Sequence, residues 1–198
     1  MMGVAREIIE AAFDEGDLVE AGDQRSLVEL ARAGDVAAFE SLVRARMNAV
    51  YRLDLAILGD DADAADAVQE TFIAAWRKVA SLRDPDRFEA WLQRVSVNAC
   101  RMIRRSRRRR LVREMSMAEL EAAASGREAP GPADGEILRA ALRRLSDDHR
   151  AVLALHHVDG LQVKEIASVI GIPEGTAKSR LFKARGALQK ALREEEHR

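Results

Sequence analysis

The stretch VKEIASVIGIPEGTAKSRLFKARGALQKAL, residues 163–192, decides the fold of the C-terminal part of the chain. Its apolar residues recur at helical spacing and predict a short helix followed by a longer one. The inner face of the short helix consists of Ile166, Ala167 and Ile170. Gly171 can adopt the left-handed conformation that ends a helix, and Pro173 suits the first position of the next. This order predicts a helix-turn-helix motif, and a plain helical hairpin is the alternative.

The longer helix of this motif has one apolar and one polar side. The apolar stripe consists of Ala177, Leu181, Ala184 and Leu188. The polar side carries lysines suited to phosphates or guanine edges, a hydroxyl, and a ring suited to a thymine methyl: Lys178, Ser179, Phe182 and Lys183. The pattern therefore predicts contacts to the major groove of DNA, whereas a solvated basic face would be the simpler interpretation.

Composition outside the motif favours an all-α protein with unevenly distributed charge. Only 4% of the 198 residues are aromatic, and good helix formers dominate. The formal net charge is −1, yet eight arginines and no acid lie between Arg101 and Arg113. Seven acids and no base lie between Glu7 and Asp23. This separation indicates a polyanion-binding site in the first segment and another partner, or solvation, for the second.

Breaks in the pattern divide the chain into two small helical domains. Gly and Pro in AAASGREAPGPADG predict a flexible linker over residues 113–135, between helical domains at 26–112 and 136–193. Residues 1–25 are predicted to be an acidic leader. The chain starts without the basic flank and apolar run of a signal peptide, and no stretch approaches the roughly 20 apolar residues of a membrane span. With a single cysteine, Cys100, the sequence favours a cytoplasmic protein.

Two helices of the first domain present contrasting faces. The helix from Asp63 to Val79 is predicted to bury Val68, Phe72 and Trp76, and its mostly acidic outer side suits either solvent or a docked protein. The helix from about Arg87 to Arg110 is predicted to turn an arginine-rich stripe outward, together with Val97. Since no acid of this helix lies one turn from these arginines, we expect no balancing charges along the stripe, which suits a phosphate backbone.

Three segments, in this order, resemble the extracytoplasmic-function sigma factors of RNA polymerase. They are DAADAVQETFIAAWRKV at 63–79, FEAWLQRVSVNACRMIRRSRRRR at 88–110, and the region from Leu145 to Leu188 that contains the helix-turn-helix. The resemblance implies a two-domain, all-α protein that binds core RNA polymerase, through the clamp helices of the beta-prime subunit, and promoter DNA. It also implies transcription of a stress or envelope regulon, and control by an anti-sigma factor.

The same resemblance assigns residues to three surfaces. The polymerase-docking residues are Asp63, Asp66, Gln69, Glu70, Ile73 and Arg77. The residues for the minus-ten element are Arg94, Asn98, Arg101, Arg104, Arg105 and Arg108. The residues for the minus-thirty-five element are Thr176, Lys178, Ser179, Arg180, Phe182 and Lys183. The loop from Leu82 to Arg87 corresponds to a pocket for a flipped-out base, and Met102 replaces an aspartate common in the family.

Other classes of function remain as alternatives. A two-domain helix-turn-helix regulator that does not bind core polymerase would share the DNA-binding motif. An enzyme with a nucleic-acid-binding tail would need a polar catalytic cluster, and the sequence indicates none. His156 and His157 are adjacent and cannot both face one helix-borne metal, so neither a metal site nor another cofactor is expected. The sequence therefore predicts no catalytic activity and no membrane contact of its own.

Overall fold

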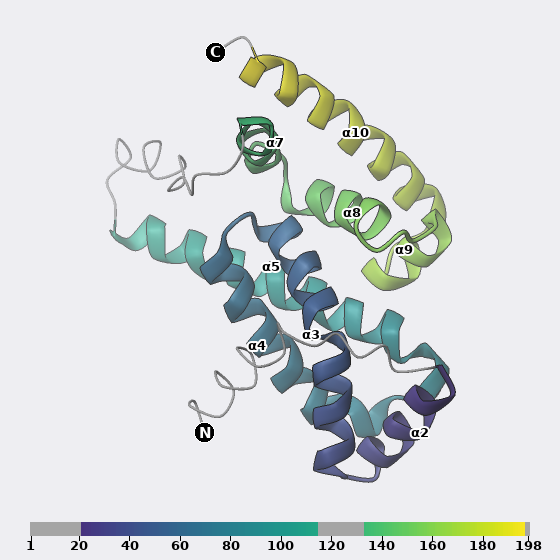
Figure 1. Ribbon diagram of the computed structural model, residues 1–198. Coiled ribbons are helices and arrows are strands. Elements are labelled where there is room, and N and C mark those ends of the chain that lie inside the picture. Colours follow the sequence, from purple (N-terminus) through teal and green to yellow (C-terminus); the bar gives the residue numbers. More distant parts are fainter. Residues whose placement is uncertain (1–20, 115–132, 197–198) are drawn as a thin grey trace.

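The computed structural model describes residues 21–114 and 133–196, and every regular element within them is helical. The first unit contains α2 (Ala21–Arg32), α3 (Val36–Leu58), α4 (Asp61–Lys78) and α5 (Phe88–Glu114), with short 3₁₀ turns at Val79–Ser81 and Pro85–Arg87. The second unit contains α7 (Ala133–Arg143), α8 (Asp147–His157), α9 (Val163–Ile170) and α10 (Glu174–Glu196). Figure 1 shows that both units are built from helices, which confirms the predicted all-α fold.

The predicted domain limits differ by a few residues from the ends of the helices. Most of the linker, 113–135, and most of the leader, 1–25, lie outside the described residues. At the edges of these segments, α5 continues to Glu114, α7 begins at Ala133, and α2 begins at Ala21.

Helix ends in the first unit lie where short polar segments interrupt the apolar pattern. Asp35 caps α3 by accepting a hydrogen bond from the Ala38 amide at 2.9 Å. Gly59 ends the same helix with φ of 71°, a left-handed conformation that glycine adopts readily. Asp60 then caps α4 through the Asp63 amide, also at 2.9 Å. These caps set the start of the helix that carries the candidate docking face.

The helix-turn-helix has the predicted geometry. Gly171 closes α9 with φ of 77° and ψ of 41°, and Pro173 immediately precedes α10. The inward residues of the two helices are buried, namely Ile166, Ala167, Ile170, Ala177, Leu181 and Ala184. Because the small Ala167 and Ala177 lie on the buried faces, α9 and α10 can pack closely while the polar side of α10 stays outside.

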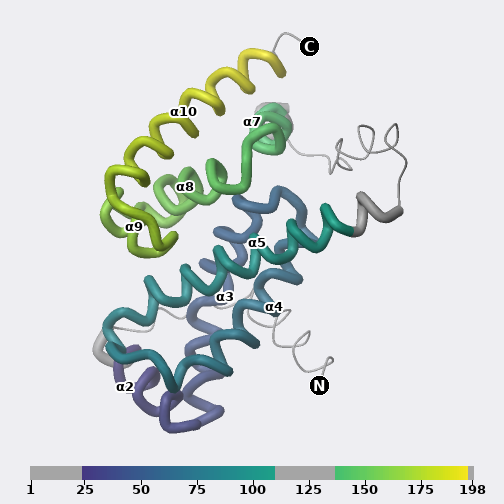
Figure 2. The backbone as a smooth tube through the Cα atoms, turned by 180° about the vertical axis from the view of Figure 1, so that it is seen from behind, coloured from purple at the N-terminus to yellow at the C-terminus, as the bar shows by residue number. Residues whose placement is uncertain are grey.

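The two units pack directly against each other. Helix α3 contacts α8, and α5 contacts α9 (Figure 2). One apolar cluster includes Leu53, Ile57, Val97 and Cys100 of the first unit, and Val152, Leu155, Ile166 and Leu181 of the second. A flexible linker between two small domains predicts that the two halves are only loosely coupled, and this shared cluster shows that the prediction is wrong for this structure. The outward placement of Val97 is wrong for the same reason, since the second unit covers that flank of α5 and leaves Val97 only 2% exposed.

A buried carboxyl group, that of Asp54, lies between α3 and α5 of the first unit. Asp54 on α3 has no exposed surface, and its Oδ1 accepts hydrogen bonds from Ser96 Oγ at 2.5 Å and from Cys100 Sγ at 3.1 Å. Burial raises the pKa of Asp54 to about 6. Asp159 of the second unit, which accepts from Gln93 Nε2 at 2.8 Å, also has its pKa raised by burial to about 6. Burial in the folded state therefore disfavours the charged form of both carboxyl groups relative to the unfolded chain.

Replacing Asp54 by asparagine should remove part of the pH dependence of stability. An aspartate has a pKa of about 3.9 in an unfolded chain, below the value of about 6 in the folded protein. The folded state binds this proton more tightly, so the contribution of Asp54 to stability falls as pH rises from about 4 to about 6. Thermal melts should therefore show the Tm of Asp54→Asn gaining several degrees on wild type between about pH 4.5 and about pH 7.

The control for this prediction is Glu40→Gln, because Glu40 is exposed on the same helix. Its Tm difference from wild type should change little over the same pH range. A Tm difference for Asp54→Asn that is constant with pH would contradict the prediction.

Candidate polymerase and nucleic-acid interfaces

The predicted docking face lies on the outer side of α4. Asp66, Glu70 and Arg77 are exposed, and Ile73 is 37% exposed. Gln69 and Asp63 are half-buried, and Asp63 forms an ion pair with Arg107 of α5. The opposite side of the helix is buried through Ala64, Ala67, Val68, Thr71, Phe72 and Ala75. The charged face is thus available without being needed for the core.

Trp76 borders this face and is 38% exposed, so the prediction that it is buried is wrong, although its ring packs on the first unit. Its ring centroid lies 5.0 Å from that of Phe39, in a tilted arrangement. Trp91 makes a similar contact with Phe88 at 5.8 Å. Both contacts agree with the preference of aromatic pairs for tilted geometry and indicate packing roles for the two tryptophans.

The arginine stripe follows one side of α5 and is only partly exposed. Arg94, Asn98, Arg105 and Arg108 are exposed, as is Met102 between them, at 66%. Arg101 and Arg104 are half-buried because they pair with α8: Arg101 Nη2 lies 3.1 Å from Asp148 Oδ1, and Arg104 Nε lies 2.7 Å from Asp147 Oδ1. The expectation that no acids would balance this stripe is wrong, since α8 supplies acids to Arg101 and Arg104.

The loop from Leu82 to Arg87 is shaped by a 3₁₀ turn that begins at Pro85. Asp84 caps the turn by accepting from the Asp86 amide at 3.1 Å. Leu82 and Pro85 are buried, and Asp86 pairs with Arg25 of α2 at 2.5 Å. These contacts fix the loop at the N-terminal end of α5, next to the start of the arginine stripe.

The outer side of α10 presents the predicted recognition residues. Thr176, Lys178, Ser179 and Lys183 are exposed, and Phe182 is 80% exposed. Arg180 differs, because it is half-buried and its Nη1 lies 3.1 Å from Asp148 Oδ2. An aromatic ring this exposed is unusual on a water-facing helix and is typical of a contact surface.

Two acids on α8 pair with arginines of the proposed DNA-binding surfaces, and the sequence pattern did not predict these pairs. Asp147 and Asp148 follow the N-cap Ser146 and occupy the first turn of α8. Locally, acids in this position indicate only the start of a helix, since they interact favourably with its dipole. Their arginine partners lie far away in the sequence, so no local signal could reveal these ion pairs.

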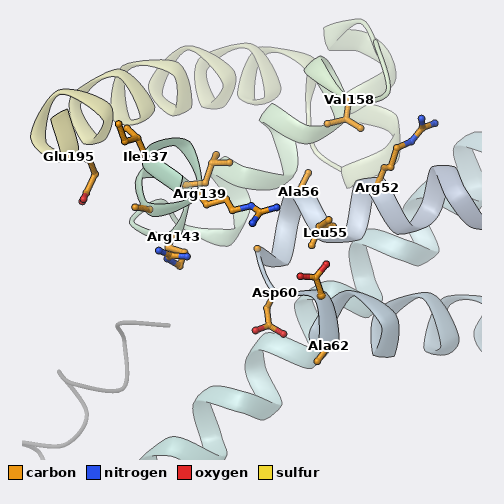
Figure 3. Close-up of a pocket in the computed structure, with 14 residues that line it drawn as sticks. Arg52, Leu55, Ala56, Asp60, Ala62, Ile137, Arg139, Arg143, Val158 and Glu195 are labelled. Atoms are coloured by element: carbon orange, nitrogen blue, oxygen red, sulfur yellow. The ribbon is translucent and has the colours of Figure 1, made fainter. Parts of the chain in front are cut away.

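A cleft of about 710 Å³ lies where the two units meet (Figure 3). The C-terminal end of α3 lines one side with Leu55 and Ala56, and α7 lines another with Ile137. Charged residues surround these apolar ones, namely Arg52, Asp60, Asp61, Arg139, Arg143 and Glu195. An apolar floor with charged edges of both signs suits an amphipathic protein segment better than a small polar ligand.

Within residues 21–114 and 133–196, no group of three or more His, Cys, Asp or Glu side chains could hold a metal ion. In the same ranges, none of the helices has the length and apolar character needed to span a bilayer.

Comparison with protein families gives two matches along the chain. The model for Sigma-70 region 2 matches residues 39–110, which include α4 and the stripe on α5. The model for Sigma-70, region 4, matches residues 135–188, which include the helix-turn-helix. The two matches follow the order of the two structural units.

Curated relatives match over most of the chain. The RNA polymerase sigma-H factor of Pseudomonas aeruginosa is 32% identical over 88% of this chain and 96% of its own. The ECF RNA polymerase sigma factor SigE of Mycolicibacterium smegmatis is 34% identical over 91% of this chain and 73% of its own. The probable sigma factor RfaY of Xanthomonas campestris is 32% identical, and the chain spans 42% of its length.

A solved structure with a similar fold is the sigma factor RpoE of Bartonella quintana in complex with the anti-sigma factor NepR. It has a TM-score of 0.66 and 26% identity, and the match covers 80% of this chain and 98% of that one. These findings give no support to a regulator that does not bind core polymerase. The chain belongs to the extracytoplasmic-function sigma factors, which bind core RNA polymerase and direct it to initiate transcription at promoters.

Proposed function

We propose that the chain performs sigma-factor function through three separate surfaces: the outer face of α4, the arginine stripe of α5 and the outer face of α10. The observation that carries this proposal is that each helix buries one side and keeps exposed many of the polar or aromatic side chains that the family resemblance assigns to it. The role requires binding rather than chemistry, so the chain needs no catalytic group of its own.

The outer face of α4 is proposed to dock on the clamp helices of core polymerase. Asp66 and Glu70 lie one turn apart on the exposed side, with Ile73 beside them. Two carboxylates around an exposed apolar residue suit a basic helical partner, because charge complementarity steers the encounter and the apolar contact is desolvated on binding.

The stripe on α5 is proposed to hold the minus-ten element and the outer face of α10 to read the minus-thirty-five element. On α5, the guanidinium groups can make paired hydrogen bonds to phosphates, and Asn98 can bind a base edge. On α10, Lys178 and Lys183 suit phosphates or guanine, while Phe182 can contact a thymine methyl.

The cleft between the units is proposed to receive an anti-sigma factor. A solved structure similar to this chain, the sigma factor RpoE of Bartonella quintana, contains the anti-sigma factor NepR as its bound partner. The apolar floor and mixed charges of the cleft suit an amphipathic segment of this kind (Figure 3).

Reversing Asp66 and Glu70 to lysine should weaken binding to core polymerase at least about tenfold, because two exposed acids would become cations facing a basic surface. The Tm should change little, since both side chains lie outside the core. A pull-down titration with core polymerase measures the affinity. The control reverses Glu29 and Glu40, which gives the same change in net charge on α2 and α3. Equal affinity of the two double variants would remove the docking assignment.

Replacing Lys178 and Lys183 by alanine should reduce the salt dependence of promoter binding by the holoenzyme. The slope of log K against log salt is negative, and each lost phosphate contact reduces its magnitude by about 0.9, because fewer counterions are released. Filter binding at several salt concentrations measures this slope. Lys190→Ala, three turns from Lys178 on the same helix, should leave it unchanged. An unaltered slope in the double variant would show that these lysines do not contact phosphates.

The substitution Ala56→Arg should block assembly with an anti-sigma factor, because a long charged side chain would fill the floor of the cleft. The probes are the products of the neighbouring genes, each mixed with the full-length protein and analysed by gel filtration. Ala37→Arg places the same side chain on an exposed part of α3 and serves as the control. A complex that forms equally well with both variants would place the partner elsewhere.

A further inference from the structure

Met102 is an apolar side chain in the middle of the arginine stripe on α5. It is 66% exposed, and among the large apolar side chains of residues 21–114 and 133–196 only Phe182 is more exposed. Asn98 lies about one turn before Met102 and Arg105 about one turn after it, so the three side chains share one face of the helix. Helix α9 contacts a different side of α5 (Figure 2). Met102 is therefore accessible to a partner that binds the stripe.

Cations lie before and after Met102 along this face. Arg94 lies about 12 Å before it and Arg105 about 4.5 Å after it, at about 1.5 Å of helix axis per residue. Arg94 also borders the turn of the helix-turn-helix, since a Cβ added to Gly171 would lie 2.7 Å from its Nη2. With the residues that the structure describes, Arg94 and Arg105 form no ion pair, so both guanidinium groups can bind phosphates. A strand whose phosphates bind both arginines must pass over Met102.

The side chain of Met102 suits contact with a nucleobase. Its polarizable sulfur makes favourable contacts with aromatic rings, and its methyl group can pack against the methyl group of thymine. A single exposed apolar residue is ordinary on a protein surface. Here, however, the surrounding arginines select a polyanion as the partner, and the bases of a nucleic acid offer apolar ring faces beside the phosphates.

The outer face of α10 combines the same kinds of side chain. Phe182 is exposed beside Lys183 and lies one turn after Ser179. Each of the two proposed DNA-binding faces therefore places one exposed apolar side chain among cations and next to a neutral polar side chain. In such an arrangement the cations give affinity that is independent of sequence, whereas the apolar and neutral polar groups distinguish between bases.

We infer that Met102 contacts a nucleobase of the minus-ten element and contributes to the selection of the promoter sequence. This inference rests on the proposed role of the α5 stripe in binding that element. Arg94 and Arg105 hold the strand by its phosphates, and Met102 adds an apolar contact whose strength depends on the base. The contact gives a preference at one position of the element, in place of a uniform gain in affinity.

The test selects DNA fragments from a library that is randomised over both promoter elements. The holoenzyme contains wild type, Met102→Ala or Met102→Leu. We expect Met102→Ala to reduce the base preference at one minus-ten position by at least about threefold and to keep the preferences elsewhere. Met102→Leu should retain most of the preference, because leucine is apolar and similar in volume. The control is Val36→Ala, which shortens an exposed apolar side chain on α3 and should select the same fragments as wild type.

Two further measurements distinguish a base contact from a structural role. The Tm of Met102→Ala should differ little from that of wild type, because the side chain lies outside the core. Its affinity for core polymerase in the absence of DNA should be unchanged. Identical selection by Met102→Ala and wild type would overturn the inference, and so would an equal loss of preference at every position. Weaker binding to core polymerase alone would also overturn it, by assigning Met102 to a protein contact.

The double variant Arg105→Ala with Arg108→Ala separates this inference from the proposed function. In the holoenzyme it should bind all selected fragments more weakly and with a smaller salt dependence, because two phosphate contacts are lost. Unchanged affinity and salt dependence would show that the proposed DNA role of the stripe is wrong. If the double variant binds more weakly while Met102→Ala selects like wild type, the stripe keeps its role and only the role of Met102 is wrong.

Discussion

The structure depends on α5 having two buried faces. One face packs against α3 and α4, and the other lies against α9 of the second unit. Burial of apolar side chains such as Phe88 on the first side and Val97 on the second is the main favourable contribution to both contacts. A helix covered on two sides leaves only a narrow strip for charged residues, and this strip carries the arginines.

Positive and negative charges nearly cancel over the whole chain, but they are concentrated on particular helix faces. The arginines of α5 find acids on α8 and α4, and these acids come from elements distant in the sequence. Partly exposed ion pairs of this kind are weak and sensitive to salt, so they select an arrangement without fixing it permanently. The buried Asp54 adds a second electrostatic element, because its charged form is disfavoured within the packed core.

Sequence patterns predicted the local structure well because the relevant signals are local. Gly171 and Pro173, for example, indicated the turn of the helix-turn-helix. The outward placement of Val97 failed because helical periodicity describes one helix and not the neighbour that covers it. The pairing of Arg101 with Asp148 was inaccessible for the same reason, since these residues lie 47 positions apart and meet only through packing of the units. Exposure and pairing of the site residues are thus properties of the tertiary structure.

The contact of Arg94 with Gly171 has an evolutionary consequence. Position 171 favours glycine twice, because its φ of 77° suits glycine and because a Cβ would approach the Arg94 guanidinium. The first constraint acts within the helix-turn-helix and persists in any arrangement of the units. The second exists only while the units are packed, so it ties the amino acid at 171 to the one at 94. Co-variation of these two positions among orthologues would therefore be a record of selection on the packed form.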